Sequence, residues 1–201
     1  MWGGYSESGR SGEQTYTCGV NKLLRTLWLL LVSSRRRPKL GILDVAHTPF
    51  RVRPTDIDVL RHMNNGVYLS IADLGRFDLL IRSGVWETFN RLGWYPVVAN
   101  QTISYRKSLD LWTKYDLQSR LVGADERGLF VEQRFVVNGE VYAQMVIRGR
   151  FLKRSGGTVS IDELSEATGV DVRALKVPEW ILRWAADAAL PTGREPAPSE
   201  W

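Results

Sequence analysis

The chain has 201 residues, of which 44% are apolar and 24% charged, and a formal net charge of +5. This length suits one domain with extensions, and the composition excludes a wholly disordered, collagen-like or polytopic membrane protein. Because Cys18 is the single cysteine, the sequence predicts no intramolecular disulfide, no structural metal and no other cofactor, and it favours a cytoplasmic location.

The excess positive charge belongs to the N-terminal segment. Residues 1–47 hold seven Lys and Arg against three Asp and Glu, whereas residues 48–201 hold twenty against nineteen. No basic stripe interleaved with aromatic residues follows in the body of the chain, which disfavours a nucleic-acid partner.

Two N-terminal segments precede the expected domain. Residues 1–19 are rich in Gly and Ser and have no apolar period, so we expect a disordered extension. Residues 20–47 form an amphipathic and basic arm whose apolar run, 27–32, is too short to span a bilayer. Two interpretations of residues 21–39 remain open: a short helix lying at an anionic membrane surface, or a helix packed on its own domain or on a partner.

The body begins with one strand and one long helix. Residues 48–53 alternate apolar and basic side chains, which predicts a half-buried strand. Residues 66–82 carry apolar or small side chains at three- and four-residue spacing, which predicts an amphipathic helix. Gly84 follows at the position where a helix end favours positive φ.

Four antiparallel strands and two helices are expected next. The strands are predicted at 95–105, 113–122, 129–137 and 140–152, with Asn138-Gly139 as a two-residue hairpin turn. This order predicts an α+β fold with its domain at 48–154. A capping box opens a helix at Ser160, and a further helix from Pro178 is expected to dock through Trp180 and Trp184. We therefore expect a helical extension over 155–190 and a disordered tail over 191–201.

The chemistry-bearing part of the sequence lies just before the long helix. Six side chains able to bond a ligand fall within thirteen positions: Asp56, Asp58, His62, Asn64, Asn65 and Tyr68. Asp and Asn at a strand-to-helix junction also serve as turn and cap residues, so a purely structural interpretation stays open at this point.

The pattern Asp-x-Asp-x-x-x-His-Met-Asn-Asn-x-x-Tyr, followed by a helix with Asp73-x-x-Arg76 and four strands, resembles the hotdog-fold acyl thioesterases of the 4-hydroxybenzoyl-CoA thioesterase class. It looks closest to the branch that includes THEM6-like proteins and, more distantly, the plant acyl-carrier-protein thioesterases. The resemblance covers residues 48–154. It implies a long central helix wrapped by a curved antiparallel sheet, and a homodimer or dimer of dimers with the acyl site between subunits.

The resemblance also implies roles for the motif residues. Asp58 takes the position of the catalytic carboxylate, as general base or nucleophile toward the thioester carbonyl. Backbone N–H groups at the helix N-terminus, with Asn65 at the matching position, would hold the oxyanion. His62 and Asn64 would orient Asp58 or a water molecule, and Tyr68 would line the pocket. The chain has Leu60 where the plant enzymes carry an Asn, so specificity for acyl carrier protein is not transferred.

Further charged residues are candidates for substrate binding. Asp73 would be the acid of a related branch that uses a helix carboxylate, although an ion pair with Arg76 on the helix surface explains it as well. The last strand carries Arg148 and Arg150, with Lys153 and Arg154 nearby, at a spacing that places at least part of this set on one face. They could contact the phosphates of coenzyme A or form the solvated face of an edge strand.

Two other features are interpreted as structural. Asp78 and Arg82 have the i,i+4 spacing of a surface ion pair, and His47 is expected to be an ordinary turn residue.

The sequence thus predicts an acyl-CoA thioesterase of fatty acid metabolism. A non-catalytic hotdog protein that binds acyl thioesters or lipids at a membrane surface is the alternative. Hydration of an enoyl thioester is the weakest hypothesis, because His62 lies four residues after Asp58 and not at the spacing of the hydratase motif.

Overall fold

The structure is a computed structural model and describes residues 28–191, 196, 198 and 199. The predicted extension over 1–19, the first part of the N-terminal arm and most of the predicted tail lie outside the described residues. Among those described, no helix is long and apolar enough to cross a membrane.

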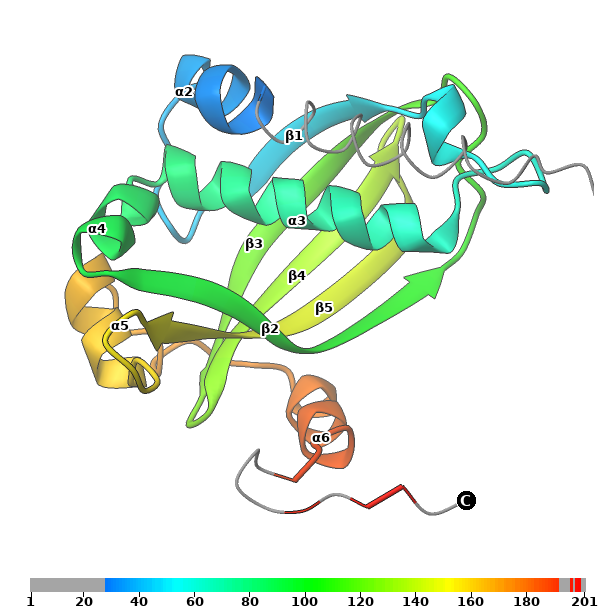
Figure 1. The fold of residues 1–201 in the computed structure, drawn as a ribbon. Helices are drawn as coiled ribbons and strands as arrows, with labels where there is room; N and C mark the ends of the chain where they lie inside the picture. Colours follow the sequence, from blue (N-terminus) through cyan, green and yellow to red (C-terminus); the bar gives the residue numbers. More distant parts are fainter. Residues whose placement is uncertain (1–27, 192–195, 197, 200–201) are drawn as a thin grey trace, which may run out of the picture.

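A five-stranded antiparallel sheet with strand order β1-β3-β4-β5-β2 forms the centre of the fold (Figure 1). Its strands are β1 (Ala46–Arg51), β2 (Trp94–Tyr105), β3 (Lys114–Asp125), β4 (Gly128–Val137) and β5 (Glu140–Lys153). Asn138 and Gly139 join β4 to β5 with φ of 50° and 84°, as the predicted two-residue turn requires. The α+β class is confirmed, and β1 begins and ends two residues before its predicted bounds.

The long helix α3 (Asn65–Arg82) lies across one face of the curved sheet (Figure 1). Its apolar side chains join Leu117, Phe135 and Met145 of the sheet in the first core cluster. Gly75 allows the close approach, because a Cβ there would lie 2.5 Å from Leu117 Cδ2. The helix ends at Arg82, and Gly84, just beyond its C-cap Ser83, has the positive φ of 76° that the sequence predicted.

A second core cluster fills the space beyond the C-terminal end of α3. It joins α4 (Val85–Arg91) and α5 (Ile161–Thr168) to the sheet, with Phe89, Phe151 and Leu164 among its buried members. The predicted capping box is present, since Ser160 and Glu163 bond one another's backbone N–H groups.

Helix α6 (Glu179–Asp187) packs on the opposite face of the sheet from α3. Ile181 and Ala185 of this helix join Phe130 and Val146, whose side chains alternate with those facing α3. Trp184 packs against the same cluster, as predicted, whereas Trp180 is exposed.

The described part of the N-terminal arm is packed on the domain. It forms η1 (Leu29–Ser33) and α2 (Ser34–Arg36) beside α3, and the Leu29 side chain is fully buried in the first core cluster. This agrees with the packing interpretation for residues 28–37. The segment therefore covers a side of α3 that the sheet does not cover.

The interpretation of Asp78 and Arg82 as surface charge is wrong. Asp78 is fully buried, and its carboxylate accepts bonds from Ser34 Oγ at 2.6 Å, Thr48 Oγ1 at 2.7 Å and Arg82 Nη1 at 3.1 Å. Arg37 Nη1 lies 3.4 Å away. The i,i+4 spacing is real, but the N-terminal segment and β1 cover it, so the pair ties three parts of the chain together.

His47 is also placed differently from its prediction as a turn residue. It lies on β1, where its Nδ1 is 2.5 Å from Asp116 Oδ2 on the neighbouring strand β3. The cross-strand partner comes from a residue 69 positions away, which local sequence does not indicate.

Candidate active site

The motif loop closes on itself between Asp58 and His62. The Asp58 N–H donates to the His62 carbonyl and the Arg61 N–H to the Asp58 carbonyl, both at 3.0 Å. Asp58 Oδ1 accepts the Leu60 N–H at 2.9 Å and lies 3.8 Å from His62 Nδ1. Among the described residues, Asp58 Oδ2 has no hydrogen-bond partner. One carboxylate oxygen therefore serves the turn, and the other is available to a water molecule.

The loop leads directly into the N-terminus of α3. Asn64 is the N-cap, with its side-chain oxygen accepting the Gly66 N–H at 2.9 Å. Asn65 is the first helical residue and is exposed, and its N–H has no partner within the described part of the chain. A free amide at a helix N-terminus points partial positive charge at whatever binds there.

Tyr68 forms one wall of the site. Its ring is buried, with edge-to-face contacts to Tyr105 at 5.0 Å and Phe135 at 4.9 Å between centroids. Burial raises the pKa of Tyr68 to about 12, so its hydroxyl stays protonated at neutral pH. The phenol can donate a hydrogen bond and cannot act as a base there.

A pocket of about 270 Å³ opens at this end of α3, and we call it the polar pocket. It brings together His62, Asn65 and Tyr68 from the predicted site with four residues around the end of β2: Tyr105, Arg106, Lys107 and Ser108. Sequence reasoning missed these four, because only the fold places the end of β2 beside the motif.

The two basic residues of the polar pocket share one partner. Arg106 Nη1 and Lys107 Nζ each lie 2.7 Å from the Glu140 carboxylate, which lowers the pKa of Glu140. All three side chains are at least two-fifths exposed. Two cations against one carboxylate leave a positive charge beside the motif.

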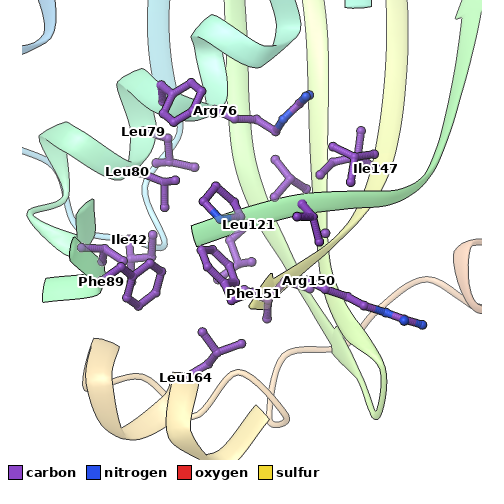
Figure 2. A pocket seen from close by; sticks show the side chains of 18 of the residues that line it. Ile42, Arg76, Leu79, Leu80, Phe89, Leu121, Ile147, Arg150, Phe151 and Leu164 are labelled. Atoms are coloured by element: carbon purple, nitrogen blue, oxygen red, sulfur yellow. The ribbon is translucent and has the colours of Figure 1, made fainter. Parts of the chain in front are cut away.

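A second, apolar cavity of about 280 Å³ lies at the other end of α3 (Figure 2). We call it the apolar cavity. Its walls come from α3, α4, α5, β2 and the middle of the sheet, and include Leu80, Phe89, Leu121, Ile147, Phe151 and Leu164. The two hollows share no lining residue.

Asp73 and Arg76 lie at the apolar cavity and not at the motif. They form the predicted i,i+3 ion pair, and Arg76 Nη1 also donates to Gln133 Oε1 at 2.6 Å. Burial lowers the pKa of Arg76, and the Asp73 carboxylate opposes that shift. This pair therefore belongs to the second hollow.

Arg148 and Arg150 are not brought together with the motif. Arg148 is buried, pairs with Asp125 and donates to the Ala185 carbonyl of α6 at 3.4 Å. Arg150 lines the apolar cavity, but its guanidinium points away from the other labelled side chains (Figure 2). Strand β5 lies between β4 and β2, so the interpretation of these residues as an edge-strand face is wrong.

Metal ligands do not gather in the described part of the chain: no group of three His, Cys, Asp or Glu side chains there could hold an ion. The candidate site therefore consists of carboxylate, imidazole, amide and phenol groups.

Comparison with known proteins connects this geometry to a family. A family model described as the thioesterase-like superfamily matches residues 52–185. This range contains the motif, strands β2 to β5 and most of α6, and it begins directly after β1.

Two curated relatives are both called Protein THEM6. The one from Danio rerio is 35% identical over 141 residues, which cover 69% of this chain and 70% of the relative. The one from Xenopus laevis is 41% identical over 99 residues, which cover 49% of this chain and 48% of the relative. The match thus spans about half the length of the Xenopus protein.

Among solved structures, the probable thioesterase YbaW from Escherichia coli has the same fold. It aligns with a TM-score of 0.58 and 24% identity over 63% of this chain and 98% of its own. The long helix on a curved antiparallel sheet is therefore the hotdog arrangement that the sequence predicted.

Proposed function

The chain belongs to the thioesterase-like superfamily, and from that premise we propose that it hydrolyses an acyl-CoA thioester to a free acid and a thiol. Asp58 is the general base or nucleophile of this proposal. Two groups near the N-terminal end of α3 carry the proposal: a carboxylate oxygen of Asp58 and the N–H of Asn65, each without a partner among the described residues. Asn65 lines the polar pocket directly, and Asp58 lies behind His62, which lines the pocket and is 3.8 Å from Asp58 Oδ1.

In the general-base route, Asp58 Oδ2 takes a proton from water as the water oxygen attacks the thioester carbon. Negative charge develops on the carbonyl oxygen, and the Asn65 N–H donates to it. The carbon–sulfur bond then breaks, and the thiolate takes the proton back from Asp58. His62, 3.8 Å from Asp58 Oδ1, orients the carboxylate.

The basic side of the polar pocket supports coenzyme A as the thiol component of the thioester substrate. Arg106 and Lys107 lie beside the motif and exceed their shared Glu140 by one positive charge. The phosphates of coenzyme A are anionic, and Arg and Lys are the side chains that bind phosphate groups. The basic end of the pocket would hold the nucleotide side of the substrate.

A homodimer, or a dimer of such dimers, is the proposed working form. Within one copy, Asn65 and Asp73 are eight residues apart, or about 12 Å along the helix, so the motif and the apolar cavity do not meet. Strand β2 is a twelve-residue edge with Tyr95, Val98 and Tyr105 exposed. A second copy paired along that edge would supply the missing half of each site.

Peripheral membrane contact through residues 21–39 is also a proposal. Trp28, Arg35 and Arg36 are exposed on the packed N-terminal segment. An aromatic side chain beside basic ones suits an anionic headgroup layer, and binding to anionic vesicles that fades with salt would support it.

The substitution Asp58→Asn tests the hydrolase. The amide keeps the size of the side chain and can still accept the Leu60 N–H, but it cannot take a proton from water. Turnover of acyl-CoA, measured as free thiol released, should fall by about 10²–10⁴-fold with the melting temperature unchanged.

The control is Asp56→Asn, two residues away in the same turn. Asp56 is buried, and its Oδ2 accepts the Arg53 N–H at 2.9 Å, so its role is in the turn. Activity per folded molecule should survive there. If both variants lose activity in step with melting temperature, Asp58 is structural too. A wild-type protein that binds acyl-CoA and releases no thiol would favour the non-catalytic alternative.

A further inference from the structure

The apolar cavity has a mouth and a closed end. Its exposed lining residues, Asp73 at 55% side-chain exposure and Val98 at 44%, lie on α3 and on the edge strand β2. Its most buried lining residues, Phe89, Leu164 and Val172, are at most 2% exposed and lie on α4, on α5 and just after it. The cavity therefore opens between α3 and β2 and ends against α5.

Side-chain packing does not explain a hollow of this size. Protein interiors contain few voids larger than a water molecule. Here about 280 Å³ stays open at the centre of the second core cluster, with Gly149 on β5 contributing no side chain to it. An apolar cavity of about 150 Å³ is enough to bind benzene. The volume is thus matched to an apolar ligand of about twice that size.

The charged groups gather toward the mouth, and Thr168, a polar lining residue on α5, donates its hydroxyl hydrogen to the Leu164 carbonyl at 2.7 Å. Arg76 bonds both Asp73 and Gln133 at the mouth, whereas Leu80, Phe151 and Leu164 line the interior (Figure 2). A ligand with one polar end and a hydrocarbon body matches this order, with the polar end at the ion pair. A compact aromatic acid would leave the end beneath α5 empty.

We propose that the apolar cavity holds the chain of an unbranched acyl group of roughly eight to twelve carbons. Its methyl end lies against α5, and its carbonyl end emerges past Asp73 and Arg76 at the mouth, where the polar pocket of the second copy paired along β2 would meet it. This names the acyl part of the substrate and rests on the proposed function. Helix α5 then sets the longest chain that the protein accepts.

The test measures binding of uncleavable substrate analogues, the S-(2-oxoalkyl)-CoA thioethers, by calorimetry over a series of chain lengths. Affinity for the full-length protein should rise by about threefold to fourfold for each added methylene and level off at roughly ten carbons. Hydrolysis of the matching acyl-CoA series is measured in parallel.

Gly149→Leu fills the cavity from the sheet. A Cβ at Gly149 would have its nearest neighbour, Ile147 Cδ1, at 3.4 Å, so the strand can accept a side chain. The longest analogues should lose about 30-fold or more in affinity, and the four-carbon analogue should lose little. Gly149→Ala, with one added carbon, should fall between this variant and the wild type.

Leu164→Ala enlarges the closed end and should move the plateau to longer chains. Its matched control is Ile181→Ala, a comparable truncation of a buried side chain on the opposite face of the sheet. Ile181→Ala should lower stability and leave the plateau where it was. These two variants keep the test valid if Gly149→Leu does not fold.

Three outcomes separate this inference from the proposed function. If affinity does not depend on chain length and hydrolysis is intact, the assignment of the apolar cavity to the acyl chain is overturned and the proposed hydrolase activity is not. Length-dependent binding that Gly149→Leu abolishes for long chains, without hydrolysis, supports the cavity and overturns the hydrolase. No binding at any length overturns both.

Discussion

The two ends of α3 carry hollows of nearly equal size and opposite chemistry. The polar pocket, about 270 Å³, is lined by imidazole, phenol and basic groups, and the apolar cavity, about 280 Å³, by aliphatic and aromatic ones. Volume therefore does not distinguish them. The N-terminal end of the helix offers the Asn65 N–H, which has no partner among the described residues, whereas the C-terminal half offers side chains that face the sheet.

The two ends of α3 are therefore suited to different parts of the reaction, bond cleavage at one end and binding of the acyl chain at the other. Groups that polarise a carbonyl are needed only where the bond breaks, and apolar walls are needed only where the chain rests. Substitutions at the polar end should then change turnover, and those at the apolar end should change chain-length preference. Four predictions test this separation, from the largest expected effect to the smallest.

Asp78 holds α3 against the N-terminal segment and β1. Asp78→Ala leaves Arg82 buried without its carboxylate and removes the acceptor for Ser34 and Thr48. Breaking a buried ion pair in this way typically costs about 3–5 kcal/mol. We expect a loss of that size in the free energy of unfolding, measured by urea denaturation, with release of the N-terminal segment.

Glu179→Gln is the matched control. It breaks a pair with the same i,i+4 spacing, Glu179 with Arg183, whose side chains are both more than two-thirds exposed. Its unfolding midpoint should stay close to that of the wild type. Equal effects of the two substitutions would show that Asp78 does not anchor the segment.

Asn65→Pro tests the polar end through the backbone. Proline is well tolerated at the first position of a helix, and Asn64 before it is already extended, with φ of −61° and ψ of 138°. The change therefore removes the backbone N–H and the side-chain amide while the helix keeps its conformation. If that N–H holds the oxyanion, turnover should fall by about 10²–10³-fold in a thiol-release assay.

Asn65→Ala separates the backbone from the side chain, because it keeps the N–H and removes the amide. Its turnover should stay within a few-fold of the wild type. The chain-length plateau should be the same in both variants. A shift of the plateau in Asn65→Pro would contradict the separation of the two ends.

Local pattern predicted much of this architecture. The helix, the four later strands, the Asn138-Gly139 turn and the capping box at Ser160 each depend on residues close together in the chain, and each is confirmed. The motif was found for the same reason, since Asp58, His62 and Asn65 lie within eight positions.

The features that the sequence did not predict depend on contacts between residues that are far apart in the chain. Asp78 looked like a surface charge until Ser34 and Thr48 were seen to cover it, 44 and 30 residues away. Arg106 and Lys107 reach the motif only because β2 ends beside α3. The apolar cavity is lined by three helices and four strands that are far apart in the sequence, and Gly149 adds no side chain to it. The spacing of residues in a sequence does not indicate such an empty volume.

Tyr68 gives a pH-dependent test at the polar end. Its pKa is raised to about 12 by burial, against 10.0 for an unburied tyrosine. The folded state therefore holds its proton over pH 10 to 12 while the unfolded state loses it, so stability falls as the pH rises through that window. A shift of this size corresponds to about 2–3 kcal/mol.

Tyr68→Phe should remove this loss. Urea midpoints measured at neutral pH and near pH 11 should differ less in Tyr68→Phe than in the wild type. An identical drop in both proteins would mean that another group titrates, for example Tyr105, whose pKa burial also raises. Hydrolysis at neutral pH should change little unless the hydroxyl donates to the substrate.

The smallest expected effect concerns the charge beside the polar pocket. Glu140 pairs with both Arg106 and Lys107 at 2.7 Å, and all three side chains are well exposed. Glu140→Gln frees a second positive charge there without disturbing the core, so the melting temperature should hardly move. If coenzyme A phosphates bind on this side, KM for acyl-CoA should fall by about twofold to threefold at low salt. The gain should vanish as added salt screens the charges.

The same variant provides a control for the separation of the two hollows. Because Glu140→Gln does not touch the apolar cavity, the chain-length plateau should stay fixed. A change in the plateau with no change in KM would mean that the two hollows are not separate sites.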